Sequence, residues 1–258
     1  MTTGRRTAAP SASGAAASAR SAAPEDMLRK AMAARTPAAR ARWAKQGLGA
    51  RSPLDKTTQA MLLRQLYLAH YEAKRFASAL EVALQAIELG VLGDVLHQDA
   101  ARAALAVDDV DAAVSHLRIA ARRGPASRRP FHLWTLGSTL FMAHRYAEAL
   151  SALERAVRWG TRDKPLYRAH LALVRVASGE RVADLQSTID ELAAAPCGQG
   201  YGRFVLGHLA YAAGAWPAAQ RYLEAFVRRT EGSRVTLALA LDPELKMARS
   251  TLAKMSAN

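Results

Sequence analysis

Apolar residues along this chain recur at helical spacing, in segments separated by short stretches rich in glycine, proline or charge. The clearest segment, Leu136 to Val157, reads LGSTLFMAHRYAEALSALERAV, and it places Gly137 among large apolar residues and Ala149 twelve positions later. A single isolated helix does not require small residues at this spacing. Two antiparallel helices that pack closely do need a small residue on each side of their contact. The segment therefore predicts a helix pair.

The same spacing occurs elsewhere in the chain, at Ala79, Ala113, Ala183 and Ala219. With Ala149 included, successive alanines are separated by 34, 36, 34 and 36 residues. Self-similarity at this period is typical of stacked helix-turn-helix repeats. The sequence thus predicts an all-α array of five helix pairs. The fourth pair, about 164 to 196, fits least well, because Glu180 stands where the other pairs have an apolar or aromatic residue.

Glycines and prolines punctuate the chain at intervals that match this period. We expect Gly90, Gly124 and Gly160 to end second helices as left-handed caps. Helix starts are expected after three signals, which are Pro24, Thr36-Pro37 and Ser52-Pro53. A last helix is expected from Asp242-Pro243-Glu244, and it would cap the stack.

Four regions follow from these signals. Residues 1–23 contain no large apolar side chain beyond Met1, so we expect a disordered tail of alanine, serine and arginine. Residues 24–52 are expected to form short helices, and residues 53–230 the array. Residues 231–258 form a C-terminal segment in which RVTLALAL alternates like a strand within an otherwise helical chain, so its structure is left open.

The third pair resembles the tetratricopeptide repeat (TPR) family through residues at the family's spacing, namely Leu133, Leu136, Gly137, Leu140, Tyr146, Ala149, Leu153 and Ala156. The resemblance covers roughly residues 60 to 230. It departs from the family at Tyr67, where a small residue is expected, and through most of the fourth pair. It implies a right-handed superhelical solenoid whose first helices line a concave surface. In this family such a surface commonly holds a peptide segment or another protein.

The charge of the chain is strongly basic and unevenly distributed. The net charge is +14, and the first 60 residues carry 11 Lys and Arg against 3 Asp and Glu. Arginine outnumbers lysine 29 to 7, which GC-rich coding would also produce. Arginine clusters fall around the connections after second helices, where cations suit the helix dipole. The remaining interpretation is a basic edge that meets an acidic protein, nucleic acid or anionic lipid. The only asparagine is Asn258, which disfavours a lysine-asparagine carboxylate clamp such as some TPR co-chaperones use.

No catalytic or metal-binding pattern emerges from the sequence. The seven histidines lack ligand spacing, and Cys197 is the single cysteine and has no activating motif beside it. The acidic cluster Asp108, Asp109 and Asp111 lies where a helix N-terminus favours negative charge. We therefore predict no enzyme activity, no cofactor and no metal. No apolar run approaches the roughly 18 residues of a membrane span, and no signal-peptide core is present, so a cytoplasmic location is expected.

The function that this sequence favours is that of a protein-protein interaction scaffold without enzymatic activity. Its groove would bind an apolar segment carrying acidic residues, with Trp134 and Phe141 as anchors and Arg102, Arg168 and Arg175 pairing carboxylates. The complete predicted site is Arg64, Tyr71, Arg102, Phe131, Trp134, Phe141, Arg168, Arg175, Tyr201, Phe204 and Tyr211. The alternative is that neighbouring helices, the N-terminal pair of helices or the C-terminal helix fill this groove, so that these rings are core residues. A nucleic-acid-associated factor that uses the basic N-terminal region and the arginine clusters is the alternative function.

Overall fold

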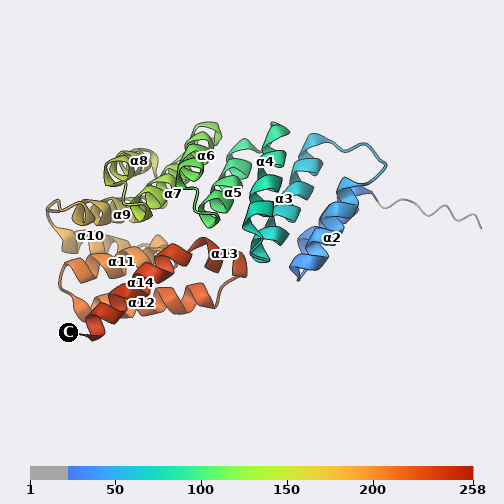
Figure 1. Ribbon diagram of the computed structural model, residues 1–258. Helices are drawn as coiled ribbons and strands as arrows, with labels where there is room; N and C mark the ends of the chain where they lie inside the picture. Colours follow the sequence, from blue (N-terminus) through green and yellow to red (C-terminus); the bar gives the residue numbers. More distant parts are fainter. Residues whose placement is uncertain (1–22, 258) are drawn as a thin grey trace, which may run out of the picture.

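The computed structural model describes residues 23–257, and the disordered tail expected at the N-terminus lies almost wholly outside them. The described residues are all-helical and contain no strand (Figure 1). The α-helices in chain order are α1 (Pro24–Ala33), α2 (Pro37–Leu48), α3 (Lys56–Glu72), α4 (Phe76–Glu88), α5 (Gly93–Ala106), α6 (Val110–Arg123), α7 (Arg129–Met142), α8 (Tyr146–Trp159), α9 (Lys164–Ala177), α10 (Leu185–Ala194), α11 (Gly202–Ala212), α12 (Trp216–Glu231), α13 (Val235–Ala240) and α14 (Asp242–Ser256).

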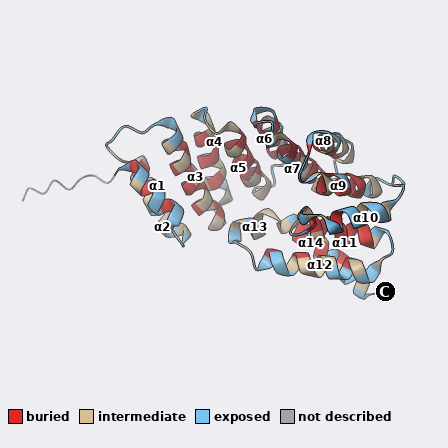
Figure 2. Ribbon diagram, turned by 180° about the vertical axis from the view of Figure 1, so that it is seen from behind, coloured by how far each residue is buried: buried red, intermediate tan, exposed pale blue. Residues whose placement is uncertain are grey.

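Each helix packs mainly against its neighbours in the chain, so contacts propagate along the row from α1 to α12. The buried residues face the spaces between adjacent helices, as Figure 2 shows. They form two clusters, one from α1 to α5 and one from α5 to α14. After α12 the chain turns back, so that α14 packs on α11 and α12 while α13 contacts α3 (Figure 1). None of the described helices has the length and apolar character needed to cross a membrane.

Two of the three predicted helix starts are confirmed. Pro24 and Pro37 are the first residues of α1 and α2, and the Thr36 hydroxyl accepts a hydrogen bond from the Ala39 N–H at 3.2 Å. The start expected directly after Ser52-Pro53 is wrong. Helix α3 begins at Lys56, because the Asp55 side chain accepts hydrogen bonds from the N–H groups of Thr57 and Thr58 and so caps the helix there.

The turns inside the five helix pairs are nearly identical. Each contains a residue with left-handed backbone dihedrals just after the first helix, and the next residue donates its N–H to a carbonyl five positions back at 2.9 Å. The left-handed residues are Lys74, Asp108, His144, Gly179 and Gly214. Because the same turn recurs every 34 to 36 residues, the repeat seen in the sequence has a counterpart in the backbone.

The close contact predicted at Gly137 is confirmed, and the second such contact is at Gly207. A Cβ added to Gly137 would lie 2.5 Å from Cγ of Leu153 and 3.4 Å from the carbonyl oxygen of Ala149. One added to Gly207 would lie 2.5 Å from the Leu223 side chain. Helix α7 can therefore approach α8 this closely only with glycine at position 137, and the same holds for α11 and α12 at position 207.

The prediction for Ala183 is wrong. Ala79, Ala113, Ala149 and Ala219 are buried in second helices, but Ala183 is exposed and lies in the turn before α10. Helix α10 starts only at Leu185, where Asp184 caps the Ser187 N–H, and it is ten residues long. The fourth pair thus keeps the turn of the other pairs but not their small-residue contact.

Of the three glycines expected as left-handed caps, only Gly90 has a positive φ, of 74°. Gly124 and Gly160 are extended instead, with φ of −65° and −69°. Glycine is required at both positions because a ring lies close to the backbone. A Cβ at Gly124 would lie 2.8 Å from the His132 ring, and one at Gly160 would lie 2.7 Å from the Tyr167 ring.

The segment RVTLALAL forms no strand. Most of it is the six-residue helix α13, which contains no buried residue. The last helix does begin at Asp242, as Asp242-Pro243-Glu244 predicts. The prediction that the arginines around the connection after α6 all end a second helix is wrong for Arg128 and Arg129. These two lie at the start of α7, where a cation does not suit the dipole.

Candidate functional site: a cavity between α7 and the C-terminal helices

A cavity of about 620 Å³ lies between one face of α7 and the C-terminal part of the chain. Its lining is largely apolar and comes from α5, α7, the start of α11, α12, α13 and the start of α14. Four residues of the predicted site line it, namely Arg102, Phe131, Trp134 and Tyr201. Ligand pockets of known proteins have this size and this predominantly apolar lining.

Trp134 forms one wall of the cavity and is held by a hydrogen bond and a ring contact. Its indole Nε1 donates a hydrogen bond to Nδ1 of His170 at 3.1 Å, and its ring meets the Tyr201 ring edge to face at 4.9 Å. His170 is fully buried, and burial lowers the pKa of its imidazole to about 3. The imidazole is therefore neutral and accepts the indole proton's hydrogen bond at Nδ1, which fixes the orientation of Trp134.

A buried polar chain closes one part of the cavity. The Ser138 hydroxyl lies 2.7 Å from the Tyr201 hydroxyl, which donates to Oε1 of Glu244 at 3.3 Å. Glu244 is buried, and burial raises the pKa of its carboxyl to about 7. Burial also raises the pKa of the Tyr201 hydroxyl well above its usual value. The three side chains connect α7, the start of α11 and α14, so this chain holds the C-terminal helix against the cavity.

The cavity carries two arginines, Arg102 from α5 and Arg229 from α12. Arg102 lies 3.2 Å from the buried carboxylate of Asp99, which also accepts a hydrogen bond from Nε of Arg64 at 2.6 Å. The carboxylate of Asp99 therefore compensates about one of the two positive charges of Arg64 and Arg102. Arg64 is held in this ion pair. The prediction of Arg64 as a partner-binding residue is not supported by this position. Arg229 is exposed and has no carboxylate within 4.0 Å among the described residues.

The other two predicted arginines lie away from the cavity lining. Arg168 donates to Glu191 at 2.7 Å. Arg175 lies 3.5 Å from Glu154 and 3.9 Å from Glu180. Both are thus paired within the chain, and the structure does not bring them together with Arg102.

Three predicted rings are core residues, so the expectation that they face an open groove is wrong. Tyr71 packs against Phe76, Phe141 against His170, and Phe204 against Phe226, and all three are buried. Tyr211 is half-buried beside Trp216 and does not line the cavity. The alternative that the chain's own helices fill the groove therefore holds for these three rings, whereas Phe131 is exposed and Trp134 is half-buried.

The predicted site contains no residue of the C-terminal segment, although the alternative allowed the C-terminal helix to fill the groove. Leu237, Leu241, Pro243 and Glu244 all line the cavity. The alternation in RVTLALAL was a signal of two unlike faces, but the pattern was ambiguous between strand and helix. Nothing local marks Glu244 as buried, because acidic residues in the first turn of a helix are usually exposed there for the dipole.

Elsewhere the fold creates one histidine pair that sequence spacing did not reveal. Nδ1 of His97 lies 2.9 Å from Nδ1 of His116, and burial lowers the pKa of His97 to about 4. Within residues 23–257 there is no group of three or more His, Cys, Asp and Glu that could hold a metal ion. Burial raises the pKa of the Cys197 thiol, which favours the unreactive protonated form.

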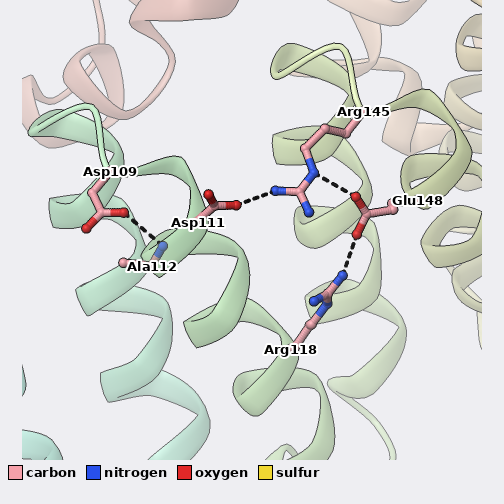
Figure 3. Close-up of polar contacts among 6 residues, drawn as sticks. All are labelled: Asp109, Asp111, Ala112, Arg118, Arg145 and Glu148. Carbon is pink, nitrogen blue, oxygen red and sulfur yellow. Dashed lines mark hydrogen bonds and ion pairs between the residues drawn. The ribbon is translucent and has the colours of Figure 1, made fainter.

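The acidic cluster at the start of α6 has the predicted capping role. The Asp109 carboxylate accepts a hydrogen bond from the Ala112 N–H at 3.0 Å, and Asp111 accepts one from Arg145, which directly precedes α8 (Figure 3). These carboxylates stabilise the helix start and an inter-helix contact.

No protein-family model matches the chain, and the search of curated proteins found no match either.

Proposed function

We propose that this chain is a TPR-like array of five helix pairs that form a right-handed superhelix with the first helices on its concave side. Support comes from the five equivalent turns and from the glycine contacts at Gly137 and Gly207. Two helix pairs depart from the pattern, at Tyr67 and around Ala183. At both departures the helices still pack against their neighbours in the chain. A repeat architecture tolerates such local departures, because each unit contacts only its neighbours.

The function that we propose on this architecture is non-enzymatic binding of a polypeptide segment in the cavity beside α7. The observation that carries the proposal is the cavity itself, which is apolar, about 620 Å³ in volume and walled by Phe131, Trp134 and Tyr201. Aromatic side chains held in fixed orientations are frequent hot spots of protein binding. Trp134 meets this condition through its hydrogen bond to His170.

The partner segment would carry an apolar anchor residue flanked by carboxylates. The cavity has room for a large apolar side chain, and its two arginines give the surroundings a positive charge that Asp99 compensates only in part. Glu244 cancels little of the remainder below pH 7, because burial raises the pKa of its carboxyl to about 7 and so keeps it mostly protonated there. The proposal includes a cytoplasmic location, which the single cysteine of the chain favours.

The test is a selection from a random-peptide display library with the whole chain as bait, followed by affinity measurements on the enriched peptides. Ala240→Phe places a ring into the cavity from α13 and should weaken binding by about tenfold or more, since it occupies the space of the anchor. Ala238→Phe is the matched control, because Ala238 lies on the same helix and does not line the cavity.

Enriched peptides should share an aromatic or large aliphatic residue near Asp or Glu. Phe131→Ala combined with Trp134→Ala should weaken them by about 2 kcal/mol. Phe141 is left unchanged in this test, because it is a core residue and its removal would destabilise the α7–α8 pair. Peptides that bind the Ala240→Phe variant as well as the parent, or a selection that enriches no such motif, would contradict the proposal.

A further inference from the structure

A second hollow of about 330 Å³ lies between α6 and α8, with α7 beneath it. Leu133, Leu136 and Leu140 form its apolar floor, whereas Arg118, Arg122 and Arg155 stand along its walls. It shares no residue with the cavity described above, because the two use different faces of α7. We call this second hollow, together with the neighbouring side chains of Arg129 and Trp159, the basic groove.

The negative charge in the basic groove is already neutralised. Glu148 is the only carboxylate of its lining, and it accepts hydrogen bonds from both Arg118 and Arg145 (Figure 3). The hydrogen bond from Arg145 lowers the pKa of the Glu148 carboxyl, so Glu148 is ionised and paired. In the described part of the chain, Arg122 and Arg155 have no carboxylate within 4.0 Å. They remain as two cations facing an apolar floor.

An exposed aromatic ring adjoins these cations. Trp159 at the end of α8 is 43% exposed, and the guanidinium carbons of Arg129 and Arg155 lie 5.6 and 5.4 Å from its ring centroid. Arg155 belongs both to this contact and to the wall of the hollow, which makes ring and hollow one continuous surface. Such an arrangement offers charge and a flat stacking surface side by side.

The helix dipole accounts for only part of this charge. Arg122 lies in the last turn of α6, where a cation is favourable. Arg129 is the first residue of α7, where the dipole disfavours a cation, and no carboxylate within 4.0 Å among the described residues compensates it. A bound anion would provide the missing compensation.

We propose that the basic groove binds a single-stranded nucleic acid, independently of the polypeptide cavity. Phosphates would pair with Arg122 and Arg155, and a base would stack on Trp159 and on the planar guanidinium groups beside it. Single-strand sites combine these two features, since cationic side chains follow the backbone and aromatic rings hold the bases. An acidic peptide would use the cations but has no comparable use for an exposed indole between two guanidinium groups.

The test is fluorescence anisotropy of a labelled oligothymidylate, longer than the roughly 4 to 16 nucleotides of known single-strand sites, with the full chain. Binding should weaken steeply as salt rises from about 50 to 200 mM. Trp159→Ala should weaken binding about tenfold through loss of stacking. Arg155→Gln should weaken binding several-fold and reduce the slope of log affinity against log salt by about one unit.

Matched controls are present in the chain. Trp216 is exposed to a similar extent, 41%, but no cation lies over its ring among the described residues, and Arg221 is an exposed arginine of α12. Trp216→Ala and Arg221→Gln should bind as the parent does. Three results would each overturn the proposal: no binding at about 50 mM salt, equal effects of Trp159→Ala and Trp216→Ala, or competition by polyglutamate that equals that of unlabelled oligothymidylate. Circular dichroism of each variant confirms that it is folded.

Discussion

Helix pairs α7–α8 and α9–α10 are neighbours with the same turn and opposite roles. The α7–α8 pair has the glycine contact at Gly137 and supplies one wall of the cavity through six residues of α7. It also supplies the floor of the basic groove from α7 and one of its walls from α8. The α9–α10 pair lacks the small-residue contact and lines neither hollow, yet its His170 orients Trp134. The α7–α8 pair thus lines both hollows, whereas the α9–α10 pair holds the Trp134 side chain in place through His170.

The repeat therefore has two separable components, the turn and the close helix contact. The turn depends on backbone geometry alone, so Gly179 preserves it in the fourth pair. The close helix contact depends on a small residue in a particular register, and it is absent where the second helix starts late, at Leu185.

The largest effect is expected from the buried imidazole of α9. The folded-state pKa of His170 is about 3, well below its usual value of 6.5, so the unfolded chain binds the proton more readily. Stability should therefore fall as pH falls below 6.5, by about 3 kcal/mol between roughly pH 7 and 4 from this group. His170→Asn keeps an acceptor for the Trp134 N–H but cannot titrate. Urea unfolding at several pH values should show a shallower acid slope for this variant, and an unchanged slope would show that His170 does not carry the effect.

The glycine contact distinguishes the two pairs directly. Gly137→Leu should destabilise the chain by about 2 to 3 kcal/mol, because a Cβ there already overlaps Leu153 and the α7–α8 contact must open. Ala183→Leu is the corresponding change in the fourth pair and should cost less than about 0.5 kcal/mol, since Ala183 is exposed. Thermal unfolding monitored by circular dichroism measures both. Equal costs would mean that the two pairs do not differ as described.

The acid that α14 presents to α7 should act in the opposite pH direction to His170. The folded-state pKa of Glu244, about 7, lies above its usual value of 4.5, so protonation stabilises the folded chain. This stability is present at low pH and is lost as pH rises toward 7, by about 2 kcal/mol between roughly pH 5 and 7. Glu244→Gln should remove the loss and make the variant more stable than the parent at pH 8. A variant less stable than the parent at that pH would contradict the assignment.

The smallest effect is expected in the turns. Gly179→Ala should cost about 1 kcal/mol, because φ at this position is 86° and the added methyl group meets no neighbour that could compensate. His144→Gly in the corresponding turn of α7–α8 should be neutral or slightly stabilising, because it relieves a left-handed non-glycine residue. Differential scanning calorimetry compares the two, and a loss of stability in the His144 variant would contradict a common turn.

The sequence predicted the helix pairs because their period is set by local features, namely small residues, apolar spacing and helix-start signals. It also identified Trp134, Phe131, Arg102 and Tyr201 as residues of one surface, since their offsets in the repeat coincide. It could not distinguish Trp134 from Phe141, because burial of a ring depends on which neighbouring helix covers it. The late start of α10 and the return of α13–α14 across the array are tertiary features that no local pattern encodes, so Ala183 and Glu244 were misjudged or missed.

The most direct test of the account is amide hydrogen exchange on the full chain, with and without a peptide from the display selection. The account predicts slower exchange in α7 and in the C-terminal segment from Leu237 to Glu244, with α10 unchanged, because only the former line the cavity. Protection confined to the basic groove, or protection of α10 equal to that of α7, would contradict the central claim that the α7 wall is the polypeptide-binding surface.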